Sequence, residues 1–221
     1  MRGRNALIGL LAATLLGCSP HPEVAVEGET LAGEVLSSGV KGCRGFPFAE
    51  PPVGDLRWQA PLQLHARAAG RDATQFAPAC MQTMRILEWY RDMAEIFGST
   101  RDEFEDLEVS EDCLYLNVWT PDTTPGANLP VMVYIHGGSN NSGWAYEPDY
   151  HGHVLAERGV VLVSIAYRLG VFGFLSHPEL DGEAVANFAL WDQLAALEWI
   201  KSNIAAFGGD PDRVMVFGES A

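Results

Sequence analysis

Basic residues are scarce in this sequence of 221 residues. Lys and Arg together number 14, against 29 Asp and Glu, which gives a formal net charge of −15. A charge of that sign repels nucleic acid and anionic lipid surfaces, so the composition argues against a nucleic-acid-binding protein. Charged residues make up 19% and hydrophobic residues 48% of the chain, which excludes a disordered or collagen-like protein and predicts a sizeable buried core.

The first apolar run of the chain is too short to span a bilayer. Arg2 and Arg4 precede the run Ala6–Leu16, and Gly17 and Cys18 follow it. A basic region, an apolar region and small residues in this order are typical of a signal peptide, which we place at residues 1–17. We therefore expect an exported protein.

The end of this segment, Leu15-Leu16-Gly17-Cys18, resembles a bacterial lipobox. A lipid on Cys18 would attach the mature protein to a membrane, with a linker at residues 18–23 and one folded domain at residues 24–221. The alternative is a soluble secreted protein in which Cys18 has no such role. The predicted location is thus the bacterial cell envelope, lipid-anchored, or the medium.

Cysteine is also rare: after Cys18 there are only Cys43, Cys80 and Cys113, an odd number for an oxidising compartment. Cys80 and Cys113 bracket a polar, acidic stretch, whereas Cys43 lies among apolar residues and glycines, as a small buried residue would. We predict a disulfide between Cys80 and Cys113. Closing a loop of this length stabilises a fold by roughly 3–4 kcal/mol in the chain-entropy model.

The chain divides into two parts of different character, and neither contains an internal repeat or a low-complexity segment. The first part predicts strands at Val24–Val35 and Val40–Phe46, irregular proline-rich chain to Pro61, a helix at Ile86–Phe97 and a solvated acidic loop at Arg101–Asp112.

From Cys113 onward, apolar and β-branched runs without alternation predict strands buried on both faces of a mostly parallel sheet. These runs are Leu114–Trp119, Val131–Ile135, Val160–Ala166 and Val214–Phe217. The intervening segments Tyr150–Arg158 and Asn187–Phe207 predict helices, the second with Asn187 as its N-cap. Alternating strands and helices predict an α/β fold with helices on both faces of the sheet.

The last strand leads into Gly218-Glu219-Ser220-Ala221. A nucleophilic serine needs a sharp strand-to-helix turn that lifts its hydroxyl clear of the sheet, in a strained conformation that costs on the order of 1–3 kcal/mol. The Gly-x-Ser pattern alone is equally compatible with an ordinary Gly-Ser turn.

A second motif, His136-Gly137-Gly138-Ser139, directly follows the strand Val131–Ile135. Glycines at this place let backbone N–H groups converge on the oxygen that becomes charged during acyl transfer. A plain glycine turn is the alternative. Both motifs in this order on alternating strands and helices favour a serine hydrolase, in which His136 positions the loop and does not titrate in the reaction.

Several further segments resemble type B carboxylesterases, and they cover nearly all of the chain after residue 24. They are Phe48-Ala49-Glu50-Pro51-Pro52-Val53-Gly54, Glu111-Asp112-Cys113-Leu114-Tyr115-Leu116-Asn117-Val118, Tyr167-Arg168-Leu169-Gly170, Asp192-Gln193, Phe207-Gly208-Gly209-Asp210-Pro211 and Phe217-Gly218-Glu219-Ser220-Ala221. The resemblance implies the α/β-hydrolase fold, here its N-terminal portion up to the nucleophile turn, acting on a small-molecule carboxylic ester without a cofactor.

The resemblance also assigns roles to single residues. It makes Ser220 the nucleophile and the backbone N–H groups of Gly138, Ser139 and Ala221 the oxyanion hole. It pairs Cys80 with Cys113, as the residues themselves favour, and Arg57 with Glu111 in a structural ion pair. The family usually has a third glycine where Ser139 stands and an apolar residue where Asn140 stands, so we expect a more polar and slightly more crowded acyl pocket.

All six histidines precede Ser220, whereas α/β-hydrolases have the order Ser, acid, His. We therefore expect the catalytic acid and His beyond Ala221, and no activity from the 221 residues alone. His151 and His153 are two apart and point in different directions, so no metal site is expected. The alternatives are a non-catalytic, cholinesterase-like binding domain at the cell surface and an inactive truncated gene product.

Overall fold

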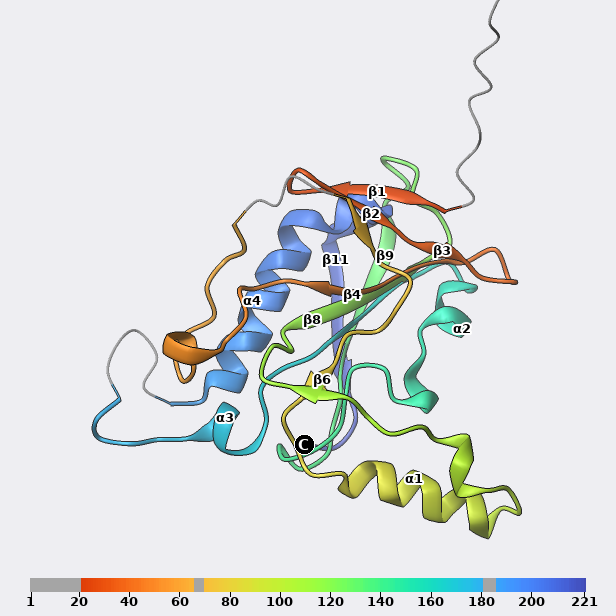
Figure 1. Ribbon diagram of the computed structural model, residues 1–221. Coiled ribbons are helices and arrows are strands. Elements are labelled where there is room, and N and C mark those ends of the chain that lie inside the picture. Colours follow the sequence, from red (N-terminus) through yellow and green to blue (C-terminus); the bar gives the residue numbers. More distant parts are fainter. Residues whose placement is uncertain (1–20, 66–69, 181–185) are drawn as a thin grey trace, which may run out of the picture.

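The computed structural model describes residues 21–65, 70–180 and 186–221, arranged around one six-stranded sheet (Figure 1). In spatial order the strands are β11 (Gly209–Gly218), β9 (Leu129–Ile135), β10 (Val161–Ile165), β8 (Tyr115–Thr120), β4 (Lys41–Pro47) and β3 (Glu34–Val35). The predicted signal peptide at 1–17, the lipobox Cys18 and the first three residues of the linker lie outside the described residues.

Strand direction differs between the two halves of this sheet. Strand β9 pairs in parallel with β10 and β11, whereas β8 is antiparallel to β10 and to β4, and β4 is antiparallel to β3. The described sheet is therefore mixed, and the predicted parallel pairing is found in β9, β10 and β11. Apolar runs report burial on both faces and carry no information on direction, which is why the sequence could not separate the two halves.

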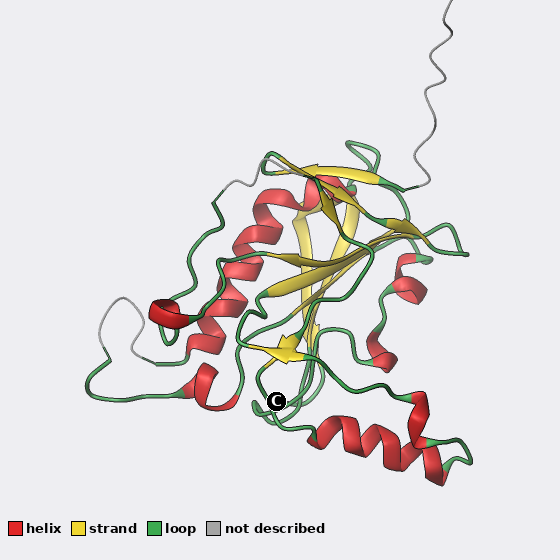
Figure 2. Cartoon of the chain, in the orientation of Figure 1, coloured by secondary structure: helices red, strands yellow, loops and turns green. Residues whose placement is uncertain are grey.

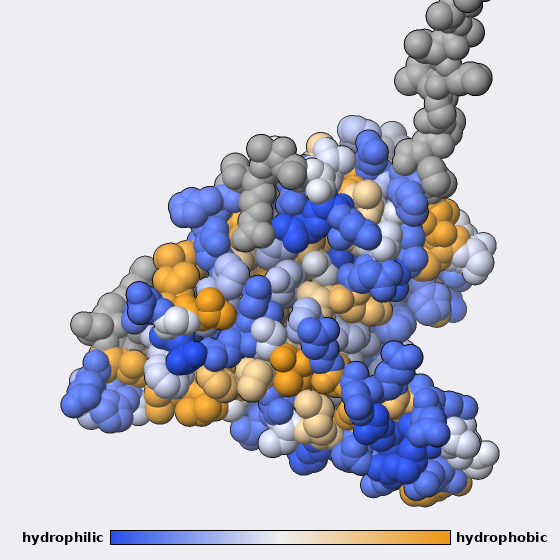
Figure 3. All heavy atoms as spheres, viewed as in Figure 1, coloured by the Kyte–Doolittle hydropathy of each residue, from blue (hydrophilic) through white to orange (hydrophobic). Residues whose placement is uncertain are grey.

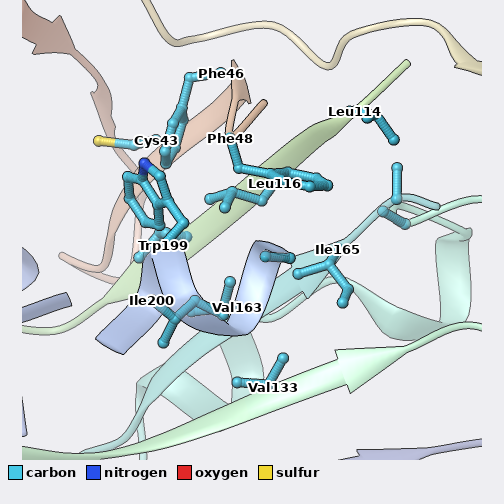
Figure 4. Close-up of a cluster of buried hydrophobic side chains, with 14 of the residues drawn as sticks. Cys43, Phe46, Phe48, Leu114, Leu116, Val133, Val163, Ile165, Trp199 and Ile200 are labelled. Atoms are coloured by element: carbon cyan, nitrogen blue, oxygen red, sulfur yellow. The ribbon is translucent and has the colours of Figure 1, made fainter. Parts of the chain in front are cut away.

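Helices cover both faces of the sheet, as predicted (Figure 2). Alternate residues of a strand point to opposite faces. In β10, Val163 packs in one cluster with Ile200 of α4 (Phe188–Asn203), and its neighbour Leu162 packs in another with Ala156 of α2 (His153–Ala156). The α4 side forms the main core, where the rings of Phe46 and Trp199 lie 5.4 Å apart (Figure 4).

Cys43 belongs to this core and is 2% exposed, in agreement with the prediction of a buried thiol. Burial disfavours the thiolate and raises the pKa of Cys43 to about 12.

The predicted strand Val24–Val35 is wrong as a single element. It is divided into β1 (Glu23–Val26), β2 (Glu29–Ala32) and β3, with a two-residue turn in which Glu27 and Gly28 both have positive φ. Strands β1 and β2 form an antiparallel hairpin that β5 (Arg71–Asp72) extends to a small separate sheet. A two-residue turn with two positive φ angles is the standard hairpin connection, which the apolar pattern alone does not reveal.

The helix predicted at Ile86–Phe97 is present as α1 (Arg85–Ile96). The acidic segment after it is more ordered than expected, because it contains the 3₁₀ turn η2 (Arg101–Glu103) and strand β7 (Val109–Ser110), which pairs with β6 (Ala79–Cys80). Ion pairs from Arg101 to acidic residues of α1 hold the turn in place.

The segment Tyr150–Arg158 is helical only in α2, after the 3₁₀ turn η3 (Pro148–Tyr150). Asn187 is the N-cap residue of α4, as predicted, but it has φ 56° and its side chain makes no capping hydrogen bond. The remaining elements are η1 (Gly54–Leu56), α3 (Gly170–Phe174) and η4 (Ile204–Phe207). None of the helices in the described part of the chain is long and apolar enough to cross a membrane.

Candidate active site

Two loops leave the same edge of the sheet side by side. Because β9 and β11 are parallel and Gly218 is in register with Ile135, the segments after them, His136-Gly137 and Glu219-Ser220, begin next to each other. Ser220 is exposed and has φ 58°, a left-handed conformation that is unfavourable for a residue with a side chain. The strand therefore ends in a strained turn that presents a hydroxyl, as the Gly-x-Ser motif predicts.

The two glycines of the first loop lie where an added side chain would clash with neighbouring backbone. A Cβ on Gly137 would lie 2.3 Å from the carbonyl oxygen of Glu219 and 2.9 Å from Cβ of Ser220. A Cβ on Gly138, which has φ +113°, would lie 1.9 Å from the carbonyl oxygen of Ser142. The motif is thus a close contact between backbones and not a plain turn.

The structure leaves three backbone donors free at this contact. Within residues 21–65, 70–180 and 186–221, the N–H groups of Gly138, Ser139 and Ala221 donate to no protein acceptor. The carbonyl oxygen of Ala221 accepts a hydrogen bond from the N–H of Asn140 (3.1 Å), which ties the two loops together. Gly138 is half-buried and Ser139 and Ala221 are exposed, and three N–H groups without a protein acceptor at one place suit an anionic oxygen.

His136 fixes the start of this loop, which we call the oxyanion loop (residues 136–143). It is 3% exposed, its ring stacks on Tyr167 at 4.4 Å, and its Nδ1 donates to the carbonyl oxygen of Gly137 (2.9 Å). The Tyr167 hydroxyl donates to the carbonyl oxygen of His136 (2.5 Å). Burial lowers the pKa of His136 to about 4, so the ring is neutral at pH 7 with its proton on Nδ1.

Sequence reasoning missed two side chains that contact the back of the oxyanion loop. The Gln82 amide donates to the carbonyl oxygen of Gly143 and accepts from its N–H, both at 2.7 Å. The Arg85 Nη2 donates to the carbonyl oxygen of Gly138 (3.1 Å) and to Oγ of Ser142 (3.0 Å). Both residues follow Cys80 closely, which is the only signal in the sequence that could have indicated their position.

A buried carboxylate, Glu147, was also missed. It is 7% exposed, and it accepts hydrogen bonds from the Tyr90 hydroxyl (3.1 Å) and from the N–H of Trp144 (3.2 Å). Burial raises the pKa of Glu147 above its ordinary value. This residue links the end of the oxyanion loop to α1.

A buried ion pair lies two residues before a further contact to the oxyanion loop. Arg168 and Asp192 are 3% and 0% exposed and form two side-chain contacts, at 2.8 Å and 2.7 Å. Two residues after Arg168, the N–H of Gly170 donates to the carbonyl oxygen of Asn140 (2.7 Å). The sequence contains both charged residues in recognised motifs, but nothing in it pairs them.

The predicted links around the site are present. Cys80 and Cys113 form a disulfide, which places the chain before α1 next to the start of β8. Arg57 and Glu111 form a two-pronged pair, Nε to Oε2 at 2.5 Å and Nη2 to Oε1 at 2.7 Å. Among the described residues, no three His, Cys, Asp or Glu side chains come together as a metal site would require.

The profile of the family described as "Carboxylesterase family" matches residues 21–221. The chain belongs to the carboxylesterase family. Among curated carboxylesterase relatives, the fumonisin B1 esterase of Sphingopyxis macrogoltabida is 40% identical over 100% of this chain and 40% of its own length. The para-nitrobenzyl esterase of Bacillus subtilis is 45% identical over 83% of this chain and 35% of its own. The chain thus spans at most about two fifths of the length of these relatives.

Solved structures of this family have the same fold. A thermophilic PNB esterase superposes with a TM-score of 0.79 and 43% identity, over 90% of this chain and 39% of that one. A carboxylesterase of Geobacillus stearothermophilus gives 0.74 and 38% identity, over 89% and 38%. The fold is that of the α/β-hydrolases, as the motifs imply.

Proposed function

We propose that this chain carries the nucleophile and the oxyanion hole of a serine carboxylic-ester hydrolase. The observation that carries the proposal is the contact between the strained turn at Ser220 and Gly137, beside the free N–H groups of Gly138, Ser139 and Ala221. Family membership supports the same reaction class.

In the proposed reaction, Oγ of Ser220 attacks the ester carbonyl and its proton passes to a base. The carbonyl oxygen becomes negative and accepts hydrogen bonds from the three N–H groups, each of which is worth about 10²–10³ in rate by analogy with other oxyanion holes. The alcohol leaves, and water then releases the acid from the acyl-enzyme.

We further propose that the base and its acidic partner lie outside these 221 residues. In the described part of the chain the ring nitrogens of His136 and His151 contact the carbonyl oxygens of Gly137 and Tyr146, and no histidine contacts Ser220. Without a base Ser220 is an ordinary alcohol, so the 221 residues alone are inactive.

The proposed substrate is a small carboxylic ester. The relatives are named for fumonisin B1 and para-nitrobenzyl esters, both small molecules. Ser139 and Asn140 are exposed at the site, with φ 57° and 59°, and they make the acyl side of the site polar.

We also propose that the protein is exported, that residues 1–17 are removed, and that Cys18 carries a lipid. Expression in a bacterial host with radiolabelled palmitate tests this. Label in the wild type and none in Cys18→Ser is expected, and equal label in both would contradict the anchor.

The reaction is tested with a fluorophosphonate probe and short-chain para-nitrophenyl esters, on the 221-residue chain and on the product of its complete reading frame. We expect labelling and hydrolysis by the complete product, near-total loss in Ser220→Ala, and no labelling of the 221-residue chain. Ser202→Ala, which removes an exposed serine hydroxyl of α4, is the control. Full activity in Ser220→Ala would contradict the nucleophile, and strong labelling of the 221-residue chain would contradict the need for an external base.

A further inference from the structure

The carbonyl oxygen of Gly138 receives an unusual number of donors. The N–H groups of Asn141 and Ser142 and the Ser142 hydroxyl lie 3.2 Å from it, and Nη2 of Arg85 lies 3.1 Å from it. This carbonyl belongs to the same peptide unit as the N–H of Ser139, which is one of the three free donors of the site. We propose that Arg85 is a positioning residue that orients and polarises this peptide unit, so that the Ser139 N–H is a stronger donor to the oxyanion. The proposal rests on the function proposed above.

The physical basis is the cooperativity of hydrogen bonds. A donor at the carbonyl oxygen of a peptide draws electron density toward that oxygen, which makes the N–H of the same peptide more positive. A charged donor does this more strongly than a neutral one. The preceding peptide unit has the same arrangement, because Nδ1 of His136 donates to the carbonyl oxygen of Gly137 and the Gly138 N–H is free. Two successive oxyanion donors thus each have a side-chain donor at the opposite end of their peptide.

The surroundings of Arg85 support a role toward the loop and not toward its own helix. Arg85 is the first residue of α1, where a positive charge opposes the helix dipole. The other arginine of this helix, Arg91, forms ion pairs with Glu88 and Asp106. The part of the molecule that carries α1 is mostly hydrophilic in Figure 3. Across the described residues Arg85 has no carboxylate partner, and its hydrogen bonds all go to the oxyanion loop. Figure 1 shows the start of α1 close to the C-terminus, where Ser220 lies.

A residue that only braced the loop would affect stability, so the test needs a direct reading of the Ser139 N–H. In the amide spectrum of the ¹⁵N-labelled chain, we expect the Ser139 proton to move upfield in Arg85→Met and to return most of the way in Arg85→Lys. The matched control is Arg91→Met on the same helix, which should leave this resonance in place. An unmoved Ser139 resonance in folded Arg85→Met would overturn the proposal. If Arg85→Met does not fold, Arg85→Gln, which keeps a neutral donor, replaces it and should give an intermediate shift. A Ser139 resonance in Arg85→Gln at the wild-type position would overturn the proposal.

The second reading is kinetic and uses the product of the complete reading frame. We expect kcat to fall roughly tenfold in Arg85→Met with KM unchanged, less than the ~10²–10³ loss for removal of a whole donor. An unchanged kcat, or a rise in KM alone, would overturn the role of Arg85. A wild type without esterase activity would contradict the proposed function instead, and the Ser139 shift would still decide whether Arg85 polarises the peptide.

Discussion

The two loops that meet at the candidate active site are held in different ways. The oxyanion loop is fixed from all sides by hydrogen bonds from Gln82, Arg85, Tyr167 and Gly170. The turn at Ser220 receives one backbone hydrogen bond, from Asn140, and follows an edge strand whose residues 214–216 are 37–50% exposed. The hydrogen bonds on the oxyanion loop indicate that its N–H groups are held in place before a substrate arrives, and the contact between Asn140 and Ala221 places the turn at Ser220 against this loop.

The largest loss should follow from breaking the buried ion pair behind the oxyanion loop. Asp192→Ala leaves the Arg168 guanidinium, which is 3% exposed, charged and without its carboxylate partner, and among the described residues only the carbonyl oxygen of Gln59 still accepts a hydrogen bond from it. We expect the free energy of unfolding to fall by about 3–5 kcal/mol, measured by urea denaturation. Asp212→Ala, which removes the exposed partner of Lys201, should cost far less. Equal losses in the two variants would show that the buried pair contributes no more to stability than an exposed one.

The next effect tests whether the loop must keep its shape. Gly138→Ala places a methyl group 1.9 Å from the carbonyl oxygen of Ser142, so the peptide units around it have to move. We expect kcat of the complete protein to fall by about 10²–10³, the loss typical of one missing oxyanion donor. Gly126→Ala is the control, because Gly126 also has a positive φ but nothing within 4 Å of an added Cβ. A normal kcat in Gly138→Ala would mean that the loop is less rigid than its contacts indicate.

The sequence predicted where the two loops lie and did not predict the contacts that hold the oxyanion loop. Their positions could be predicted because Gly-x-Ser and His-Gly-Gly each follow an apolar strand, and local patterns carry that information. The contacts that hold the oxyanion loop could not, because Gln82 meets Gly143 across 61 residues and Arg168 meets Asp192 across 24. Such partners are chosen by the packing of distant segments, and the pairing of β8 with β10 in the antiparallel sense was missed for the same reason.

A smaller loss of stability should follow from lowering the pH. The folded protein holds His136 neutral, with its pKa lowered from 6.5 to about 4, whereas the unfolded chain binds a proton near pH 6.5. The contribution of His136 to the free energy of unfolding is therefore fully present above pH 6.5, and it falls by roughly 1.4 kcal/mol per pH unit as the pH drops toward 4. Glu147, with its raised pKa, changes stability in the opposite direction with pH.

The His136 contribution is isolated by subtracting the pH-stability curve of His136→Gln from that of the wild type, since Glu147 is present in both. We expect the wild type to lose more stability than the variant between pH 6.5 and 4. Parallel curves would mean that His136 takes up its proton over the same pH range in the folded protein as in the unfolded chain, and that burial does not lower its pKa.

The smallest effect concerns Gln82, which joins the disulfide-linked segment to the oxyanion loop. Gln82→Ala leaves the N–H and the carbonyl group of buried Gly143 without partners, and we expect a loss of about 1–3 kcal/mol in the free energy of unfolding. Gln82→Glu keeps the acceptor for the Gly143 N–H but turns a carboxylate oxygen toward the Gly143 carbonyl oxygen, so it should also destabilise the fold. If the comparison between the loops is correct, hydrogen exchange in Gln82→Ala will rise in residues 136–143 more than at residues 219–221, because only the oxyanion loop depends on this contact. A uniform rise in both loops would show that Gln82 supports the whole edge of the sheet and that the two loops are not held independently.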